Sequence, residues 1–485
     1  GYEMKTRLFL LSLSVVVLLS QIACGEAQSN DAETEMTMTL SADTDETTES
    51  TGLEPKDFNG YTFRMLRFDQ AWNNMQLDAE SETGDTLNDA IYRRNRIVEE
   101  ECGILLEDMS VSAGQIESMV QKNVAGGTND FDVVWGQTIS MLNMAQNGFL
   151  LELNTEVPYI NLSKPWWTQS ANECFSIINK LYVAVNDISL SYFDSVMPMA
   201  MNMRIAEEYQ LDDPYELVHN GKWTMDAESK MLVTVTSDIN GDGQYTIKDD
   251  LFGIFGMSEE YLSLCTASGC QIILKDENDI PYLAISDEKF MNAFEKAISI
   301  LNQGNVFANF RLPEYKIDTG DLSTFTDGRA LFFSDVLYWL SGMRDMKDDF
   351  AILPRPKYDE SQDEYYSSVH ETAAIMGIPV TSNTEICGHV IETLAFESYK
   401  TVIPQYYNMV LSQKFARDED SIEMLDLIFK NRIIDLGVVY NWGNVNTQLK
   451  AYAEKSNSDI ASFAASISSQ IETSIEKMVD AYRNN

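Results

Sequence analysis

The stretch that decides the fold is NDFDVVWGQTISMLNMAQNGFLLELN, residues 129–154, because the spacing of its apolar residues changes within a few positions. Residues 131–135 are mostly β-branched and aromatic, which predicts a short buried strand that Gly136 ends. A helix is predicted next, and Gly148 stops it before a second apolar run at residues 150–153. The apolar side chains of this helix lie three or four positions apart: Ile139, Leu142, Met144, Ala145 and Phe149. The stretch therefore predicts a βα unit.

Strands and helices also alternate on the N-terminal side of this unit. Residues 61–68 have the pattern of a strand, residues 86–101 that of a helix, and residues 104–109 that of the next strand. Residues 124–127 end another helix, which leads into the βα unit. Strict alternation of this kind predicts an α/β fold with a parallel sheet.

The same stretch carries a family resemblance. An Asp-Val-Val strand, a polar loop, a helix that ends in Gly and the motif Leu-x-x-Leu-Asn resemble a βα unit of bacterial extracellular solute-binding proteins. These are the receptors of ABC importers, and the likeness is to the oligosaccharide-binding branch. Further segments are similar to Gram-positive lipoproteins of this family: GDTLNDAIYRRN, YELVHNGKWT, DFAILPRPKYDESQDEYYS, YKTVIPQYYNMVL and DSIEMLDLIF. The resemblance covers the chain from about Phe58 to the C-terminus.

The resemblance implies an α/β fold of the periplasmic-binding-protein-like type II, with two lobes that are joined by a multi-strand hinge. Each lobe is expected to contain a central, mostly parallel sheet. The expected first lobe consists of residues 58–192 and 325–400, and the expected second lobe of residues 193–324 and 401–485. Residues 196–202 resemble the strand that crosses between the lobes, although Met203 stands where the family has Lys.

The function that the resemblance implies is that of a monomeric extracellular receptor, without enzymatic activity, that delivers a carbohydrate to the permease of an ABC importer. The formal net charge of −42 argues against nucleic acid as a partner, because phosphates require a basic face. A neutral oligosaccharide is favoured for the same reason, although Arg311 or Arg344 leaves a uronate open. A surface receptor for glycan adhesion or sensing on the same fold is the alternative.

The N-terminus has the pattern of a secretion signal. Lys5 and Arg7 precede an apolar run at residues 8–19, which is too short to span a bilayer but fits the core of a signal peptide. Small residues before Cys24 resemble a lipoprotein signal, so residues 1–24 are expected to be a signal peptide whose Cys24 is lipidated. Simple cleavage is the alternative. The chain is then expected to be anchored by lipid at the extracellular face of the membrane.

Residues 25–57 are rich in Ser, Thr, Asp and Glu. Such a composition cannot bury enough apolar surface to fold, so these residues are expected to form a disordered acidic tether. Beyond Cys24 the chain has five cysteines, which cannot form a complete disulfide framework. Cys265 and Cys270 either pair or are buried thiols. The three histidines do not have the spacing of zinc ligands.

The segment DINGDGQYTIKD, residues 238–249, has the spacing of a calcium loop. Oxygen side chains stand at loop positions one, three and five, a carboxylate stands at twelve, and Gly243 at six permits a sharp turn. A structural Ca²⁺ is therefore expected, although an Asx-rich turn without metal remains possible. The expected ligands are Asp238, Asn240, Asp242, the Gln244 carbonyl and Asp249.

Aromatic residues at loop positions favour carbohydrate binding over catalysis. The sequence has no nucleophile elbow, phosphate-binding glycine loop or His-Glu-x-x-His motif. A glycoside-cleaving carboxylate pair remains an alternative, because Asp and Glu are abundant. Sugar rings stack on aromatic planes, and ligands of α/β sheets lie beyond the carboxyl ends of strands, where Trp135 falls. Trp223 is expected to pack in the core. The predicted ligand-binding residues are Trp72, Trp135, Gln137, Trp166, Trp167, Asp187, Trp339 and Trp442.

Overall fold

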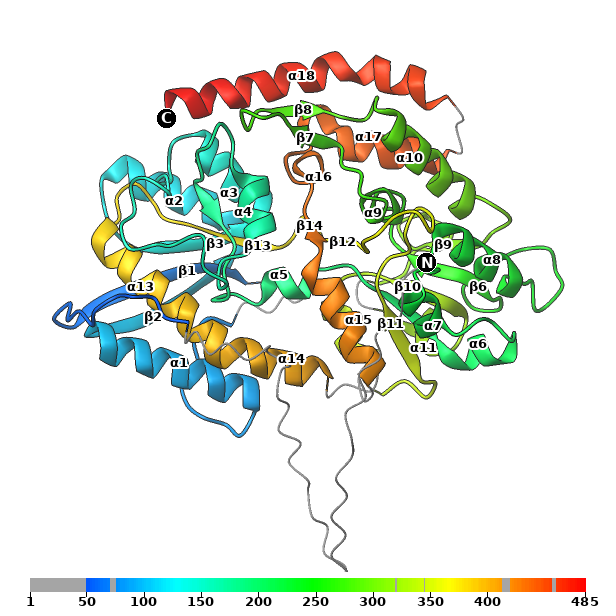
Figure 1. The fold of residues 1–485 in the computed structure, drawn as a ribbon, viewed down its shortest axis with the longest axis horizontal. Helices are drawn as coiled ribbons and strands as arrows, with labels where there is room; N and C mark the ends of the chain where they lie inside the picture. Colours follow the sequence, from blue (N-terminus) through cyan, green and yellow to red (C-terminus); the bar gives the residue numbers. More distant parts are fainter. Residues whose placement is uncertain (1–48, 70–75, 319–320, 344, 412–418, 456–458) are drawn as a thin grey trace, which may run out of the picture. The chain divides into compact units, whose positions relative to one another are not determined.

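The computed structural model describes residues 49–69, 76–318, 321–343, 345–411, 419–455 and 459–485. The chain divides into two compact units, Gly1–Glu49 and Ser50–Asn485, and every element described below belongs to the second (Figure 1). The predicted signal peptide with Cys24, the predicted tether up to residue 48, and Trp72 fall outside the described ranges.

The end of the predicted tether is attached to the folded body. Lys56 forms an ion pair with Glu385, and the His389 ring nitrogen Nε2 lies 3.0 Å from the Glu54 carbonyl oxygen. The prediction that the tether extends to residue 57 is therefore wrong, because specific contacts hold its last residues.

The first sheet has the strand order β2-β1-β3-β13-β4. β1 is parallel to β2 and β3, whereas β13 is antiparallel to both β3 and β4, so only β13 runs against the other four strands. The strands are β1 (Tyr61–Asp69), β2 (Ile104–Ser112), β3 (Val133–Gln137), β4 (Val183–Ala184) and β13 (Ala374–Gly377).

The second sheet has the order β11-β5-β10-β6-β9 and is built in the same way. β6 is parallel to β10 and β9, whereas β5 is antiparallel to β10 and β11. The strands are β5 (Met199–Asn202), β6 (Phe252–Gly256), β9 (Phe307–Asn309), β10 (Ala330–Ser334) and β11 (Phe350–Leu353). We call the parts around the two sheets the first and second lobes.

The strand that runs against the others marks an exchange of chain between the lobes. β5 enters the second sheet after the chain leaves β4, and β13 enters the first sheet after the chain leaves β11. In Figure 1 the yellow β13 accordingly lies among the blue-to-teal elements of the first lobe. The strand directions confirm the expectation of two lobes with mostly parallel sheets, and the repeated passage of the chain between the sheets confirms a multi-strand hinge.

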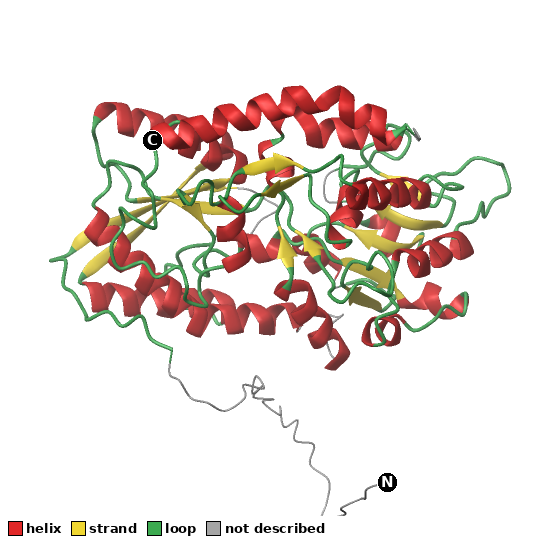
Figure 2. Ribbon diagram, turned by 45° about the horizontal axis from the view of Figure 1, so that its top comes forward, coloured by secondary structure: helices red, strands yellow, loops and turns green. Residues whose placement is uncertain are grey.

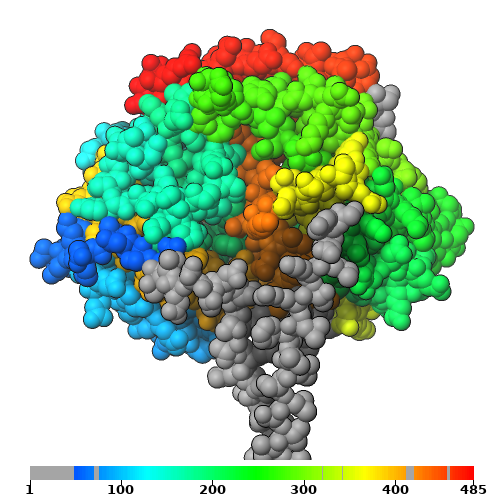
Figure 3. All heavy atoms as spheres, viewed as in Figure 1, coloured from blue at the N-terminus to red at the C-terminus, as the bar shows by residue number. Residues whose placement is uncertain are grey.

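The assignment of residues 325–400 to the first lobe is wrong for the strands β10 and β11. Both strands pair with β5 in the second sheet, and only β13 joins the first sheet. The hinge also contains a two-stranded parallel sheet of β12 (Ser367–Ser368) and β14 (Arg432–Ile433). Figure 3 shows the orange segment that includes β14 at the surface between the teal residues of the first lobe and the yellow and green residues of the second.

Helices flank both sheets (Figure 2). The longer helices are α1 (Thr86–Cys102), α2 (Ile116–Gly126), α3 (Thr138–Gln146), α8 (Met225–Val235), α9 (Glu260–Ala267), α10 (Glu288–Leu301), α13 (Thr384–Glu397), α14 (Ile403–Leu411), α15 (Glu419–Lys430), α17 (Val445–Glu454) and α18 (Ile460–Asn484). The shorter helices are α4 (Gln169–Phe175), α5 (Ser191–Asp194), α6 (Met203–Glu208), α7 (Pro214–His219), α11 (Ser323–Thr326), α12 (Leu337–Leu340) and α16 (Leu436–Tyr440). The 3-10 turns η1 (Ala113–Gln115), η2 (Ser341–Met343) and η4 (Trp442–Asn444), the π-helix η3 (Ser398–Val402) and the hairpin strands β7 (Ile273–Lys275) and β8 (Pro281–Leu283) complete the described elements.

Residues 401–485 do not belong to the second lobe alone, as the sequence had suggested. α14 packs on α1 of the first lobe, whereas α15 packs on β11 of the second. α18, red in Figures 1 and 3, contacts α3 of the first lobe and α10 of the second. The C-terminal helices therefore join the two lobes.

The strand in the central βα unit differs from its prediction by two residues. β3 starts at Val133 and continues through Gly136 to Gln137. A Cβ added at Gly136 would lie 2.8 Å from the Met141 sulfur and 3.3 Å from Ile116. Gly136 therefore permits the close packing of side chains from α2 and α3 on the strand instead of ending it.

Several local predictions hold in the structure. Thr224 is the N-cap of α8, and its hydroxyl accepts a hydrogen bond from the Ala227 backbone N–H. Trp223 is fully buried, and Cys265 and Cys270 are free buried thiols. No helix in the described ranges has the length and apolar character needed to cross a bilayer.

Candidate functional site

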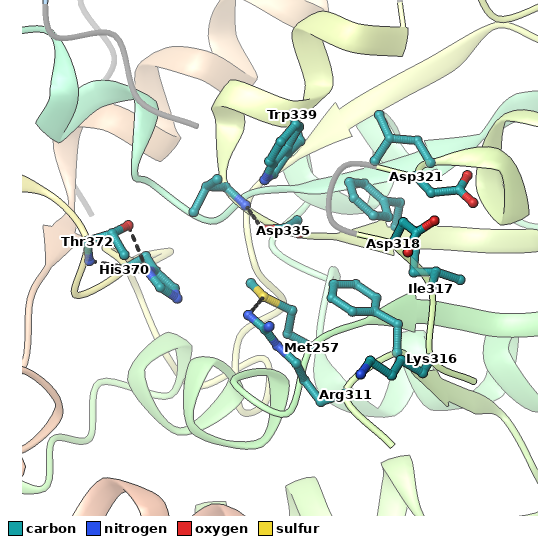
Figure 4. A pocket seen from close by; sticks show the side chains of 14 residues that line it. Met257, Arg311, Lys316, Ile317, Asp318, Asp321, Asp335, Trp339, His370 and Thr372 are labelled. Carbon is teal, nitrogen blue, oxygen red and sulfur yellow. Dashed lines mark hydrogen bonds between the residues drawn. The ribbon is translucent and has the colours of Figure 1, made fainter. Parts of the chain in front are cut away.

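A cavity of about 480 Å³ lies at the carboxyl ends of β6, β9 and β10 in the second sheet (Figure 4). These three strands are parallel, so the residues that follow them meet at one edge. Its volume lies within the range of small-molecule sites. We call it the first cavity. Its walls are formed by Met257, Phe310, Arg311, Lys316, Ile317, Asp318, Asp321, Leu322, Phe333, Asp335, Val336, Trp339, His370 and Thr372.

The strand ends place the polar and apolar groups of the first cavity. Met257 follows β6, Arg311 follows β9 by two residues, and Asp335 follows β10. Close approach of β6 and β10 needs glycine, because a Cβ at Gly256 would lie 3.0 Å from the Ser334 carbonyl oxygen. The Arg311 backbone N–H donates to the Asn309 side-chain oxygen at 3.1 Å, which fixes the start of its loop.

Asp335 is the buried carboxyl group of the first cavity, with 7% of its surface exposed. Burial raises its pKa to about 7, although its Oδ1 accepts a hydrogen bond from the Val336 N–H at 2.7 Å and Arg311 favours the charged form. Near neutral pH this group is therefore partly protonated. In that state its hydroxyl can donate a hydrogen bond while its carbonyl oxygen accepts one.

The aromatic wall of the cavity is formed by Trp339 and its neighbours. Trp339 is half-buried on α12, and its ring makes an edge contact with Tyr338 at 5.4 Å between centroids. Met257, Val336 and Phe310 belong to the same apolar cluster. In Figure 4 the Trp339 ring stands beside Asp335, so an apolar plane and a polar group lie close together.

Charged side chains form the rim. Arg311 is exposed, with its guanidinium nitrogen Nη2 3.2 Å from the Met257 sulfur, and Lys316 and Asp318 are exposed on the following loop. Asp321 accepts a hydrogen bond from the Ser323 N–H. The rim carries two cations, Arg311 and Lys316, and two anions, Asp318 and Asp321, so the lining does not select one sign of charge.

The connection from β12 to β13 contributes His370 and Thr372. The His370 Nδ1 atom accepts from the Thr372 N–H at 3.2 Å, which leaves the proton of the neutral ring on Nε2. The His370 backbone N–H donates to the Ser195 carbonyl oxygen at 2.9 Å. Two segments that connect the lobes are thus bonded to each other at the edge of the cavity.

Of the predicted ligand-binding residues, the structure places Trp339 in the first cavity. The expectation that Trp135 emerges toward a ligand is wrong, because its side chain is only 1% exposed. β3 is covered on both faces, and Trp135 pairs with Arg67 on one side and Met376 on the other. A ring without a free face cannot stack on a sugar.

Three more of the predicted tryptophans, Trp166, Trp167 and Trp442, are also buried. Trp166 and Trp167 are buried, and their indole N–H groups donate to Glu392 at 3.1 and 3.0 Å. Trp442 is buried and stacks on Tyr440, with 4.3 Å between ring centroids. Their positions beside Pro and Gly indicated loops correctly but did not indicate exposure.

The remaining predicted residues do not meet in the first cavity. Gln137 is the last residue of β3 and pairs with Ala374. Asp187 and Trp167 line a different cavity. Trp72 and Arg344 fall in gaps between the described ranges.

Sequence reasoning missed most of the residues that line the first cavity. The signal for Met257 and Asp335 was present, because each directly follows an apolar strand and the carboxyl-end rule applies there too. His370 and Thr372 carry no such signal, since the path of the hinge alone brings them to the site.

The acidic loop at residues 238–249 forms a turn that uses its own carboxylates. Asp238 accepts hydrogen bonds from the Gly241 and Gly243 N–H groups, both at 2.7 Å. Asp242 accepts from the Gln244 N–H, whereas Asp249 is exposed and accepts only from the Thr246 hydroxyl. In the described ranges no group of three or more His, Cys, Asp or Glu side chains is arranged to hold a metal.

Solved structures resemble this chain along most of its length. A sugar transporter from Rhizobium etli in an open conformation has a TM-score of 0.56 at 14% identity, covering 88% of this chain and 100% of that one. A cyclic alpha-maltosyl-1,6-maltose binding protein from Arthrobacter globiformis has 0.54 at 11%, covering 88% and 100%. An ABC substrate-binding protein from Listeria monocytogenes in complex with cycloalternan has 0.51 at 13%, covering 88% and 98%.

No family model matches the sequence, and no curated protein matches it. The structural likeness therefore establishes the fold: the chain has the periplasmic-binding-protein-like type II fold of ABC substrate-binding proteins.

Proposed function

We propose that the protein is an extracellular receptor that binds a carbohydrate in the first cavity and delivers it to an ABC importer. The observation that carries this proposal is the pairing of a half-buried Trp339 with the buried carboxyl of Asp335 at the carboxyl edge of the second sheet. A sugar ring has an apolar face for the indole and hydroxyls for the polar groups. The resemblance to sugar-binding structures supports the same class of ligand.

A neutral oligosaccharide fits the first cavity best. Asp335 in its protonated form offers a donor and an acceptor without a full charge, and the His370 Nε2–H adds a donor. Arg311 offers a planar fork that matches neighbouring hydroxyls, although the same fork could hold a uronate. The role is binding rather than catalysis, and the receptor acts as a monomer.

Two further features belong to the proposal. Lipidation at Cys24 would hold the receptor at the extracellular face of the membrane, which suits delivery to a permease. The loop at residues 238–249 would hold a structural Ca²⁺, because its oxygen ligands are spaced as hard cations require.

The test is a thermal-stability screen of the purified chain against neutral oligosaccharides and uronates, followed by calorimetry of each hit. A ligand that binds only the folded state must raise the melting temperature. Trp339→Ala is expected to weaken binding about tenfold to a hundredfold, taking about 1–3 kcal/mol for stacking on an aromatic ring. The matched control is Tyr282→Ala, which removes an exposed ring on β8 outside the first cavity and should leave affinity unchanged.

Equal loss of affinity in Trp339→Ala and Tyr282→Ala would remove Trp339 from the site. A folded protein that responds to no sugar in the panel would contradict the proposed function itself.

A further inference from the structure

A second cavity, of about 800 Å³, lies between α4, α14 and α15, and it shares no lining residue with the first cavity. One wall comes from the first lobe, with residues 165–173 and Asp187, and another comes from α15 and β14. α15 packs on β11 of the second lobe. The second cavity therefore receives side chains from chain segments that belong to both lobes.

Arg432 is a buried cation in the lining of this cavity. It is 9% exposed, and only its Nε is bonded, to the Phe429 carbonyl oxygen at 2.9 Å. Its guanidinium lies against the rings of Phe193, at 4.2 Å, and Tyr192, at 5.0 Å. Among the described residues, neither of its terminal nitrogens has a hydrogen-bond or ion-pair partner, and Nη1 is fully buried. A buried guanidinium whose terminal nitrogens have no acceptor is costly, so these nitrogens favour the binding of an acceptor from outside the described chain.

Two further polar groups that line this cavity, the Asp187 carboxyl and the Tyr407 hydroxyl, also lack a hydrogen-bond partner in the described chain. Asp187 is 6% exposed, and burial raises its pKa to about 8 despite the nearby Arg432 charge. Burial also raises the pKa of Tyr407 to about 12. Within the described chain, neither the Asp187 carboxyl nor the Tyr407 hydroxyl makes a hydrogen bond to protein. Both lie close enough to Arg432 for its charge to affect them, yet Asp187 and Arg432 form no ion pair within 4 Å.

We propose that the second cavity is a binding site for a small neutral polyhydroxylated molecule, such as a single sugar or a cyclic polyol, held by Asp187, Tyr407 and Arg432. Neighbouring hydroxyls can accept from the guanidinium fork and also donate to the carboxyl and phenol oxygens. Aromatic side chains supply apolar surface for the ring, since Phe193, Tyr399 and Tyr407 line the same space.

The rim argues for a neutral molecule. Glu173, Glu423 and Asp426 face one cation, Lys430, so an anion meets net repulsion as it approaches. A zwitterion such as an amino acid would need an ionised Asp187 for its ammonium group, whereas burial keeps that carboxyl protonated near neutral pH. A neutral polyol can form hydrogen bonds with Asp187, Tyr407 and Arg432, and it neither is repelled by the acidic rim nor requires an ionised Asp187.

The experiment uses the full chain with D-glucose and myo-inositol as probes, and with phosphate and glycine as the charged and zwitterionic alternatives. Each is added at about 20 mM, which saturates a site of millimolar Kd. Hydrogen–deuterium exchange locates the contact, and NMR titration gives the affinity. We expect glucose or inositol to protect residues 165–173 and 423–432, and Tyr407→Phe to weaken that binding about two- to tenfold by removing one hydroxyl.

Tyr282→Phe is the matched control, because Tyr282 is exposed and does not line the second cavity, so the loss of its hydroxyl should leave the affinity unchanged. Trp339→Ala should also leave it unchanged. Loss of the protection in Trp339→Ala would place the sugar in the first cavity and overturn this proposal without touching the proposed function. The proposal is equally overturned if neither polyol protects these residues, or if only phosphate or glycine does.

Discussion

The chemistry of Asp335 depends on its buried position at the end of β10. The same side chain in an unfolded chain ionises near pH 4, whereas burial raises its pKa to about 7 in the folded protein. Between these values the folded state holds a proton that the unfolded state has released. The free energy of unfolding must therefore fall as the pH rises from about 4 to about 7, and the loss is complete above that range.

We expect Asp335→Asn to remove this loss, because an amide does not ionise and its oxygen can still accept from the Val336 N–H. Relative to the unsubstituted protein, the variant should gain on the order of 2–4 kcal/mol between pH 4.5 and pH 8. Urea unfolding at the two pH values measures the gain. Asp318→Asn, an exposed change in the same cavity, is the control and should gain little. If the difference in the free energy of unfolding between Asp335→Asn and the unsubstituted protein stays constant with pH, Asp335 ionises as an exposed residue does.

Trp135 and Trp339 show why residue type alone does not place a ligand site. Both stand near the carboxyl end of a strand. Trp135 is still within β3, where neighbouring strands and helices cover both faces of the sheet. Trp339 lies five residues beyond β10, on a short helix that the sheet no longer covers. Distance past the strand end, rather than the aromatic ring, decides exposure.

At the scale of elements, the loop at residues 238–249 is the clearest separable unit. Its carboxylates at Asp238 and Asp242 support the turn through backbone N–H groups, whereas Asp249 at position twelve makes only one side-chain contact. Removing Asp249 should therefore delete a calcium ligand while leaving the turn intact.

We expect calcium at about 1 mM to raise the melting temperature of the unsubstituted protein, and Asp249→Ala to abolish that rise. The control is Asp212→Ala, an exposed carboxylate between α6 and α7, which should keep the response. Differential scanning fluorimetry with calcium and with a chelator measures both. An equal melting temperature in calcium and chelator for the unsubstituted protein would identify the loop as a turn without metal.

At the scale of the whole molecule, the chain consists of two compact units, an N-terminal segment and the folded body. The folded body begins at Ser50 and contains every described helix and strand. In the sequence, an acidic segment separates Cys24 from Ser50. We expect protein from the native membrane fraction to start at a lipidated Cys24. Mass spectrometry of its N-terminal peptide is the measurement, and an unmodified N-terminus beyond Cys24 would contradict the anchor.

What the sequence by itself determined is local. Apolar spacing predicted β1, α1 and the central βα unit, and Thr224 was recognised as a helix cap, because these features depend on neighbours within a few residues. Together with the family resemblance, the alternation of strands and helices was enough for the α/β class and the two-lobed fold.

Only the tertiary structure decided which segments meet. Residues 325–400 read as one continuous part of the chain, yet β10 and β11 join the second sheet and β13 joins the first. His370 and Thr372 reach the first cavity because their connection crosses the hinge, and Asp187 and Arg432 line the second cavity although they are far apart in sequence. Strand pairing and burial are set by contacts between residues far apart in sequence, so no local pattern of residues records them.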